Sequence, residues 1–411
     1  MALVHDYGDL RVGVQLWYEW RYDDSGCFGA KGNTAFWHPN NDGDLSPLGS
    51  IMMTGYYNSP NNRHGTLIFG NNPKNTSARP AVARPTGYTF IWNDQGTRGK
   101  HDGSLWRPTA PSGYTAMGDV VNAGYSAPST NNVWCIRSDL VKPGVGATST
   151  ASTNWFQMDW MSFKSITCTP VVPQPLNAYG AEKLPVSAGA FFAGTTDGRS
   201  GTNSTTVCFV PTLEVKNEFK ELVAPMPTYT KDTLPTTGTK YDSFEQCKVT
   251  LPYTAFFDPE HVPSLTAYKT TNNPFITVGR SIAWYVEGVW QNDTDGNLKR
   301  EKLMKYGIST TDSTEITHSV GISISATAGI GVVESSITLN YQFTHTDTHS
   351  FTEYSERQTT ESNDVPAHTA SVLFSKHIVI KAYRGEEKSE DVLGLTEIVA
   401  NDDVHWKGIK L

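Results

Sequence analysis

The stretch that decides the fold of the second half of the chain reads ITHSVGISISATAGIGVVESSITLNYQF, residues 316–343. Its apolar side chains recur at every second position, which is the period of a β-strand with one apolar and one polar face. They fall on even numbers up to residue 328 and on odd numbers from residue 333. This change of parity predicts two antiparallel strands joined by a turn at 329–332.

The two faces of this predicted hairpin differ in chemistry. Pairing Ala328 with Val333 and Ile324 with Ile337 keeps every apolar residue on the same face. The apolar set is Ile316, Val320, Ile322, Ile324, Ala326, Ala328, Val333, Ile337, Leu339, Tyr341 and Phe343, with Ile330 and Val332 in the turn. The polar set is Ser319, Ser323, Ser325, Thr327, Glu334, Ser336, Thr338, Asn340 and Gln342.

Three features favour insertion of this hairpin into a membrane. No Lys or Arg lies between Lys305 and Arg357, and the flanking segments are rich in Ser and Thr. The apolar run 320–328 is long enough for a tilted strand to cross a bilayer, which takes about 9–11 residues. A hairpin lying on a soluble core would also alternate, but its turn would be polar, whereas this one is Gly-Ile-Gly-Val. The polar set is therefore predicted to line a pore.

Two histidines share the apolar parity at the base of the hairpin. The predicted pairing places His318 opposite Phe343 and His345 opposite Ile316. Imidazole titrates near pH 6.5, so both are candidates for pH sensing. The alternative is that they are simply polar residues at the point where the strands leave the lipid.

The first 215 residues contain a threefold internal repeat with a period of about 65 residues. Each copy has a proline motif, a glycine ten residues later, a second glycine and then an apolar strand. The proline motifs are Phe36-Trp37-His38-Pro39, Leu105-Trp106-Arg107-Pro108 and Thr167-Cys168-Thr169-Pro170, the first glycines are Gly49, Gly118 and Gly180, and the second are Gly55, Gly124 and Gly189. Three small sheets around a pseudo-threefold axis predict a β-prism, with a β-trefoil as the alternative.

Copy two carries a resemblance to a known family. Its segments 105–108, 117–121 and 135–140 are similar to the vacuolar-protein-sorting-associated domain numbered sixty-two. The matching residues are turn glycines, prolines and core aromatics, so the resemblance implies a fold and not an activity. Loops at the ends of the prism are candidates for receptor or glycan binding, although Asn and Asp are also ordinary turn residues. The candidates are Asn40, Asn41, Asp42, Asn61, Asp94, Asp102, Asn131 and Asn132.

A Pro/Thr-rich break separates the two halves. We predict a receptor-binding domain at 1–223, a linker at 224–240 and an elongated antiparallel β domain at 241–411. Residues 240–385 resemble the aerolysin superfamily, especially its epsilon-toxin and mosquitocidal-toxin branch. The resemblance rests on the Ser/Thr-rich strands around hairpin 316–343 and on the segment Val365-Pro366-Ala367-His368-Thr369. This resemblance implies receptor binding, assembly into a homo-oligomeric ring and insertion of a β-barrel, with insecticidal or cytolytic activity.

Composition and charge argue against several classes of function. A net charge of −8 offers no basic surface for nucleic acid. No signal peptide or transmembrane helix is expected, so the protein is predicted to be stored in the cytosol or released without the general secretion signal and to act on a target membrane. We expect no enzyme, cofactor or metal site, and five cysteines in reduced form. The alternative function is a non-lytic, lectin-like or membrane-trafficking binding protein.

Overall fold

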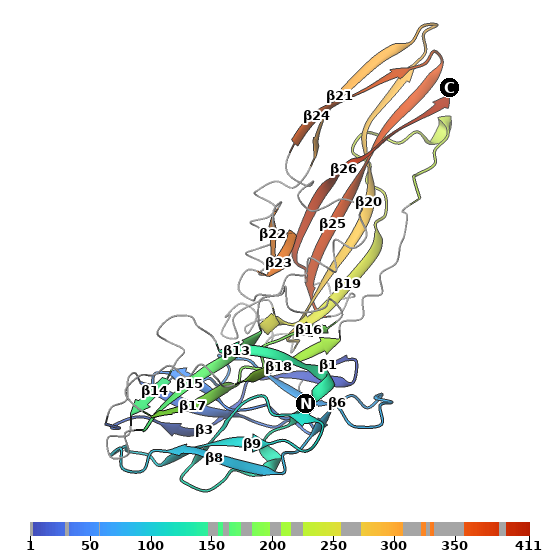
Figure 1. The fold of residues 1–411 in the computed structure, drawn as a ribbon. Coiled ribbons are helices and arrows are strands. Elements are labelled where there is room, and N and C mark those ends of the chain that lie inside the picture. Colours follow the sequence, from blue (N-terminus) through green and yellow to red (C-terminus); the bar gives the residue numbers. More distant parts are fainter. Residues whose placement is uncertain are drawn as a thin grey trace. The chain divides into compact units, whose positions relative to one another are not determined.

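The computed structural model describes residues 3–28, 33–56, 58–146, 155–158, 164–173, 183–197, 207–214, 225–255, 273–306, 322–325, 329–332, 357–385 and 392–411. These residues form antiparallel β-strands joined by turns and short 3₁₀ helices, and they include no α-helix (Figure 1). The described part of the chain accordingly has no helix able to span a bilayer. The all-β fold class is confirmed.

The chain divides into two compact units. The first unit contains Met1–Lys216, Pro252–Pro274 and Ser335–Ile337. The second unit contains Asn217–Leu251, Phe275–Glu334 and Thr338–Leu411.

Three antiparallel sheets of similar layout build the first unit. In each sheet the central strand carries the proline motif of one repeat. The sheets are β3 (Tyr18–Asp23), β4 (Thr34–Pro39) and β5 (Ile51–Thr54); β8 (Gly87–Asn93), β9 (Gly103–Thr109) and β11 (Val120–Ala123); and β14 (Trp155–Met158), β15 (Lys164–Pro173) and β17 (Phe191–Asp197).

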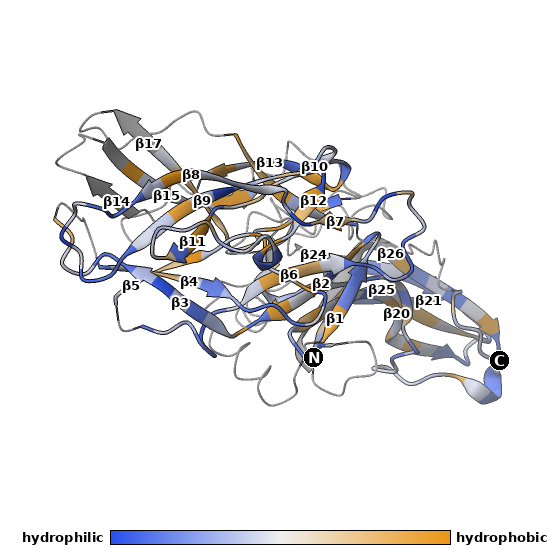
Figure 2. Cartoon of the chain, turned by 90° about the horizontal axis from the view of Figure 1, so that it is seen from below, coloured by the Kyte–Doolittle hydropathy of each residue, from blue (hydrophilic) through white to orange (hydrophobic). Residues whose placement is uncertain are grey.

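Each repeat adds a second strand pair that contains its apolar strand. The pairs are β2 (Leu10–Gln15) with β6 (Thr66–Asn71), β7 (Val82–Ala83) with β12 (Cys135–Arg137), and β13 (Val141–Gly146) with β18 (Cys208–Glu214). The outer strands β1 (Val4–Tyr7), β10 (Tyr114–Thr115) and β16 (Lys183–Pro185) extend them. Figure 2 shows hydrophobic and hydrophilic residues alternating in short stretches along these strands.

One core joins the three repeats. It consists of buried side chains from all three central sheets: Tyr22, Phe36, Trp92, Leu105, Val121, Ile166, Cys168, Phe191 and Ala193. Complete burial of a large apolar side chain stabilises a fold by about 1.5–3 kcal/mol. A core shared by three separate sheets is the arrangement of a β-prism.

Backbone hydrogen bonds join the three repeats near Gly49, Gly118 and Ala190. The Ser50 amide donates to the Asp119 carbonyl, and the Asp119 amide donates to the Phe191 carbonyl, both at 2.9 Å. A Cβ atom built on Gly118 would lie 2.4 Å from the Cβ atom of Ala190, so no side chain fits there. These contacts align Ala190 with Gly49 and Gly118. The proline-to-glycine spacing of the sequence aligns Gly189 with Gly55 and Gly124. This alignment is wrong, because in the structure Gly189 corresponds to Leu48 and Met117.

A four-stranded sheet forms most of the second unit. Its strand order is β19 (Phe244–Pro252), β20 (Phe275–Asn292), β25 (Thr369–Arg384) and β26 (Val392–Lys410). Strand β20 is rich in β-branched and aromatic residues, which favour extended backbone. A bulge between Val286 and Gly288 interrupts its pairing with β25.

The segment predicted as a linker packs on this sheet. The Tyr241 amide donates to the Trp284 carbonyl at 2.9 Å, and the amide of Gly238 and the carbonyl of Thr239 bond to Val286. Tyr229 is buried in a cluster with Trp284 and other residues of β20 and β25. Residues 225–240 therefore belong to the second unit, because the sheet supplies partners for backbone groups that a free linker would leave to water.

Candidate membrane-insertion hairpin and receptor loops

Two paired strands lead into and out of the predicted hairpin. Strands β21 (Leu298–Tyr306) and β24 (Arg357–Val365) pair antiparallel over their whole length without a bulge. Within the described residues they form a two-stranded sheet of their own. The backbone arrangement therefore brings residues 306 and 357 together at the base of the hairpin.

The side chains of this strand pair alternate between two faces. On β21 the even-numbered Met304 and Tyr306 are buried, and they pack against Leu373 of β25. The odd-numbered Leu303 is 57% exposed, and its neighbours Lys299, Glu301 and Lys305 are exposed as well. Tyr306 also donates to Glu361 across the pair at 2.7 Å. On β24 the inward parity is odd, because Val365 is buried and Asp364 is exposed.

The parity of β21 and β24 agrees with that of the hairpin sequence. Even numbers face inward on the incoming strand, and odd numbers face inward on the outgoing strand. The apolar residues of the hairpin occupy the same even and odd positions. The parity of the described strands therefore matches the parity of the predicted hairpin, although residues 307–321 and 333–356 between them lie outside the described residues.

Within the hairpin sequence the structure describes only two short strands. β22 (Ile322–Ser325) pairs with β23 (Gly329–Val332), with Ile324 opposite Ile330 and Ser323 opposite Gly331. The expected turn at 329–332 is therefore wrong for this form of the protein, because the chain reverses between Ser325 and Gly329. Ile330 and Val332 still share the even parity of Ile322 and Ile324, so a shorter connection satisfies the same alternation.

Most other predicted hairpin residues lie outside the described residues. In the apolar set, the residues outside the described part of the chain are Ile316, Val320, Ala326, Ala328, Val333, Ile337, Leu339, Tyr341 and Phe343. On the polar set they are Ser319, Thr327, Glu334, Ser336, Thr338, Asn340 and Gln342, and the histidines His318 and His345 lie there too. Their assignments stay predictions.

Two of the predicted receptor loops come together in the first unit. The Asn41 side chain donates to the Asn131 carbonyl at 3.1 Å, which joins repeat one to repeat two. The Asn40 amide donates to the Trp17 carbonyl, and the Trp17 indole is 52% exposed. Asp42 is held in a local turn by backbone bonds with Leu45. We call this region, comprising Trp17, Asn40–Asp42 and Asn131–Asn132, the asparagine loops.

A buried histidine supports the asparagine loops from beneath. His38 Nε2 lies 3.1 Å from the Asn132 carbonyl, and its Nδ1 lies 3.0 Å from Ser50 Oγ. Ser50 Oγ also accepts the Val121 amide. The Asn132 carbonyl can only accept a hydrogen bond, so Nε2 of His38 carries the proton. In the neutral ring Nδ1 then accepts the hydrogen bond of the Ser50 hydroxyl. Burial and the nearby Arg21 charge lower the pKa of His38 to about 4.

An arginine stacks on a tryptophan beside these loops. The Arg84 guanidinium carbon lies 3.4 Å from the centre of the Trp134 ring, a cation–π contact. Its Nη1 donates to the Asn131 and Val133 carbonyls. The Trp134 indole donates in turn to the Asp44 carbonyl at 3.0 Å. Sequence inspection missed this pair, because the two residues are far apart along the chain.

The remaining loop candidates have structural partners. Asn61 accepts the Tyr18 amide at 2.6 Å, and Asp94 accepts the Gly103 amide at 2.9 Å. Burial raises the pKa of Asp94. Asp102 accepts the hydroxyl of Tyr125 at 2.9 Å. The Asp94 contact has a counterpart in repeat one, where Asp24 accepts the Thr34 amide. Asn61 is thus bonded to the start of strand β3, and Asp94 to the start of strand β9.

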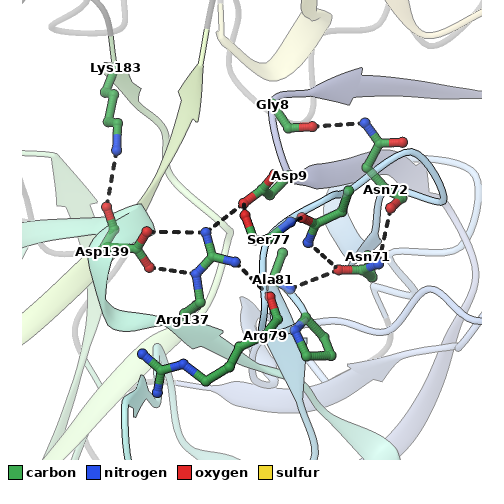
Figure 3. Close-up of polar contacts among 12 residues, drawn as sticks. Gly8, Asp9, Asn71, Asn72, Ser77, Arg79, Ala81, Arg137, Asp139 and Lys183 are labelled. Atoms are coloured by element: carbon green, nitrogen blue, oxygen red, sulfur yellow. Dashed lines mark hydrogen bonds and ion pairs between the residues drawn. The ribbon is translucent and has the colours of Figure 1, made fainter.

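Two arginines of the first unit, the buried Arg137 and the half-buried Arg107, form ion pairs that the sequence pattern did not predict. Arg137 donates to Asp139 at 2.6 Å and to Asp9 at 2.5 Å, while Ser77 donates to Asp9 at 2.6 Å (Figure 3). Hydrogen bonds from Arg137 lower the pKa of Asp139. Arg107 forms a bidentate pair with the fully buried Asp119, with both bonds at 2.9 Å. Arg137 and Asp9 lie 128 residues apart, so no local sequence pattern predicts their pairing.

The described residues contain no group of three His, Cys, Asp or Glu side chains able to hold a metal ion. Cys135, Cys168 and Cys208 are buried free thiols, and burial raises the pKa of each. Cys27 is half-buried beside the hydroxyls of Tyr22 and Thr97.

Comparison with known proteins identifies the first half of the chain. The family model for vacuolar protein sorting-associated protein 62 (Vps62) matches residues 27–232, about half of the chain. The chain belongs to the Vps62 family. The matched range of this Vps62 protein covers the central sheets of all three repeats except strand β3 (Tyr18–Asp23). No curated protein matches the chain.

Two solved structures are similar to this Vps62 protein at a low level. GNIP1Aa from Chromobacterium piscinae is 19% identical with a TM-score of 0.36, over 47% of this chain and 34% of that protein. The matched part thus spans about a third of the length of GNIP1Aa. Cry35Ab1 is 11% identical with a TM-score of 0.33, over 98% of this chain and 90% of that protein.

Proposed function

We propose that this protein is a pore-forming toxin. Its first unit binds a cell-surface receptor, its second unit assembles with copies of itself into a ring, and hairpin 316–343 inserts into the target membrane. The observation that carries the proposal is the shared parity of β21, β24 and the hairpin sequence. The side chains of β21 and β24 are already sorted into two faces, and the hairpin sequence continues one face as apolar and the other as hydroxyl-rich.

Assembly follows from the physics of the hairpin. A single two-stranded hairpin in lipid would leave the outer backbone groups of both strands without partners, at a cost of several kcal/mol each. Copies of the hairpin satisfy these groups when they pair edge to edge in a closed β-barrel. The resemblance of residues 240–385 to the aerolysin superfamily supports the same mechanism, and no catalytic step is required.

The asparagine loops are the proposed receptor surface. They combine an exposed indole with amide side chains, which suits a glycan because sugar rings stack on aromatic faces while their hydroxyls bond to amides. The loops join two repeats, so the core of the first unit fixes their backbone. A protein receptor would use the same chemistry.

Dye release from vesicles tests the proposal. Phosphatidylcholine–cholesterol vesicles loaded with a self-quenched dye are mixed with the protein, with and without prior trypsin treatment, and susceptible cells are tested in parallel. Release of dye or lysis of cells supports pore formation. Binding to cells with no release from either target would instead favour the second candidate function, a non-lytic lectin-like or trafficking protein, which the family name and the asparagine loops favour.

A further inference from the structure

Trp17 is an exposed aromatic residue at the end of a strand pair. It is 52% exposed, although tryptophan side chains are highly buried on average. The register of β3 with β4 places Tyr18 opposite Pro39, so the next step outward places Trp17 opposite Asn40. The Asn40 amide donates to the Trp17 carbonyl at 3.0 Å, which continues the pairing to this step. Opposed residues share one face of a strand pair, so the Trp17 indole and the exposed Asn40 side chain lie on the same face.

A buried glutamine holds the backbone of both residues. Gln15 Oε1 accepts the amides of Leu16 and Trp17, both at 3.0 Å. Gln15 Nε2 donates to the Asn40 carbonyl at 2.9 Å. A regular antiparallel ladder would join the Trp17 amide directly to the Asn40 carbonyl, and here the Gln15 side chain lies between them. The backbone that carries Trp17 is therefore bonded through Gln15 and Asn40, while its indole is left to solvent.

The second repeat shows that this fold does not require the tryptophan. The register of β8 with β9 places Gly87 opposite Thr109, at the positions that Trp17 and Asn40 occupy in the first repeat. A Cβ atom built on Gly87 would have no described atom within 4 Å beyond its chain neighbours, so a side chain there would meet open space. The same sheet thus forms without an aromatic residue at this position. An exposed indole on a fixed backbone suits a binding anchor, because little freedom is lost when a ligand stacks on it.

The chemistry of this pair fits a sugar ring. The C–H groups of a pyranose pack on an aromatic face, and its hydroxyls bond to an amide group, which both donates and accepts. The Asn40 backbone is bonded to Gln15 and Trp17, but within the described residues its side-chain amide has no hydrogen-bond partner. That amide is therefore free to bond to a sugar hydroxyl beside the indole.

The charges around the pair favour a neutral sugar over an acidic one. Recognition of a carboxylate normally uses Arg or Lys, which form charge-assisted hydrogen bonds. The segments 15–18 and 39–44 contain neither residue, and Asp42 and Asp44 add negative charge. The Arg84 guanidinium beside the asparagine loops is already stacked on Trp134 and bonded to backbone carbonyls.

We propose that Trp17 and Asn40 bind a neutral pyranose residue of a cell-surface glycan, and that Gln15 is the positioning residue that fixes both. This inference rests on the proposed receptor-binding role of the first unit and names the class of ligand at that site. Gln15 does not touch the sugar and acts through the backbone of the two residues that do.

Four single variants of the full chain test this assignment. Trp17→Ala removes the stacking surface, whereas Trp17→Phe keeps a smaller one. Gln15→Met keeps the length of the side chain and loses its hydrogen bonds to Leu16, Trp17 and Asn40. Asn61→Ala is the matched control, because it also removes a bond from a side chain to a nearby backbone amide, that of Tyr18.

Binding is measured on an array of immobilised neutral and sialylated glycans, and on susceptible cells before and after periodate oxidation of their surface sugars. We expect the unaltered protein to bind neutral glycans and to lose binding to oxidised cells. Trp17→Ala should weaken binding to the best neutral glycan by roughly tenfold or more, and Trp17→Phe by less. Gln15→Met should weaken it by about threefold to tenfold, since binding must then order the freed backbone, and Asn61→Ala should leave it within about twofold. Because Gln15 acts through Trp17, the Gln15→Met, Trp17→Ala double variant should lose less than the product of the single effects.

Four outcomes would overturn the inference: no glycan binding, binding to sialylated glycans alone, unchanged binding by Trp17→Ala, or equal weakening by Gln15→Met and Asn61→Ala. Full binding to periodate-treated cells would also overturn it and would identify a protein receptor instead. Lysis of cells in any of these cases would leave the pore-forming function standing without this sugar site. Neutral-glycan binding without lysis or dye release would remove the pore-forming function and leave the sugar site in place.

Discussion

The repeats of the first unit and the strand pair β21–β24 of the second differ in how their charged side chains are placed. In the first unit, Arg107 pairs with the buried Asp119, and the buried Arg137 pairs with Asp9 and Asp139. On β21 the Lys and Glu side chains are largely exposed, and Tyr306 bonds to Glu361 across the strand pair. The second unit does bury charge elsewhere, at Arg280 and Arg384. The contrast is therefore between the ion-paired repeats and the strand pair that frames the hairpin, and not between the two units as a whole.

The largest expected effect comes from a charge on the apolar face of the hairpin. Ile324→Lys should abolish dye release, because a Lys facing lipid near mid-membrane costs about 2–4 kcal/mol in every protomer of a ring. Ser323→Lys is the matched control, since it places the same charge on the polar face. It should still insert and should change the ion selectivity of the pore. Equal loss of release by both folded variants would contradict the assignment of the two faces.

The next effect concerns the buried ion pair of the first unit. Asp119→Ala leaves the Arg107 guanidinium without its carboxylate and removes the acceptor of the Ala193 amide. Breaking a fully buried pair costs about 3–5 kcal/mol, and because the Arg107 side chain is 35% exposed we expect the lower end of this range. Urea unfolding followed by tryptophan fluorescence should show the loss in the first unit. Asp44→Ala, at an exposed loop position, should change the unfolding free energy by no more than about 0.5 kcal/mol.

A smaller effect should appear as a pH dependence of stability. The pKa of His38 falls from 6.5 in the unfolded chain to about 4 in the folded protein. The unfolded state therefore binds the proton more readily, and the folded protein should lose stability as the pH falls from about 6.5 to 4, by roughly 3 kcal/mol in total. Urea unfolding across this range should show a flatter pH profile for His38→Gln. An unchanged profile would show that His38 is not the group responsible.

The smallest effect on stability is expected at the asparagine loops. Asn41→Ala removes one exposed hydrogen bond and should change the unfolding free energy by less than about 0.5 kcal/mol. If the loops bind the receptor, the same change should weaken binding to susceptible cells. Asn61→Ala provides the contrast, because loss of its bond to the Tyr18 amide should cost about 1 kcal/mol without weakening binding. Unchanged cell binding by Asn41→Ala and Trp17→Ala together would exclude this surface.

Local patterns in the sequence predicted much of this fold. Two-residue alternation gave the strands, and the spacing from proline to glycine gave three repeats. The third copy was misaligned because its strand is shifted: the core residues Ile166 and Cys168 lie four and two positions before Pro170, whereas Phe36 and Leu105 lie three positions before their prolines. The bulges after Trp20 and Phe90 occur at equivalent places in the first two copies.

Long-range partners could not be predicted in the same way. Nothing near Arg84 in the sequence points to Trp134, and nothing near His38 points to Asn132. Strand alternation fixes the face of a side chain but allows several registers of the same parity. The hairpin faces could therefore be inferred from the sequence, whereas the β22–β23 pairing could not.

The strand pair β21–β24 also has a consequence for digestion. Lys305 and Arg357 are the last basic residues before the hairpin and the first after it, and both lie in paired backbone, opposite Gln358 and Tyr306. Trypsin cuts after Lys or Arg and takes its substrate as an unpaired, extended segment. It therefore finds no cleavage site inside the hairpin, and its nearest sites are masked by strand pairing. A digest that removes other parts of the chain should leave the hairpin as one intact peptide.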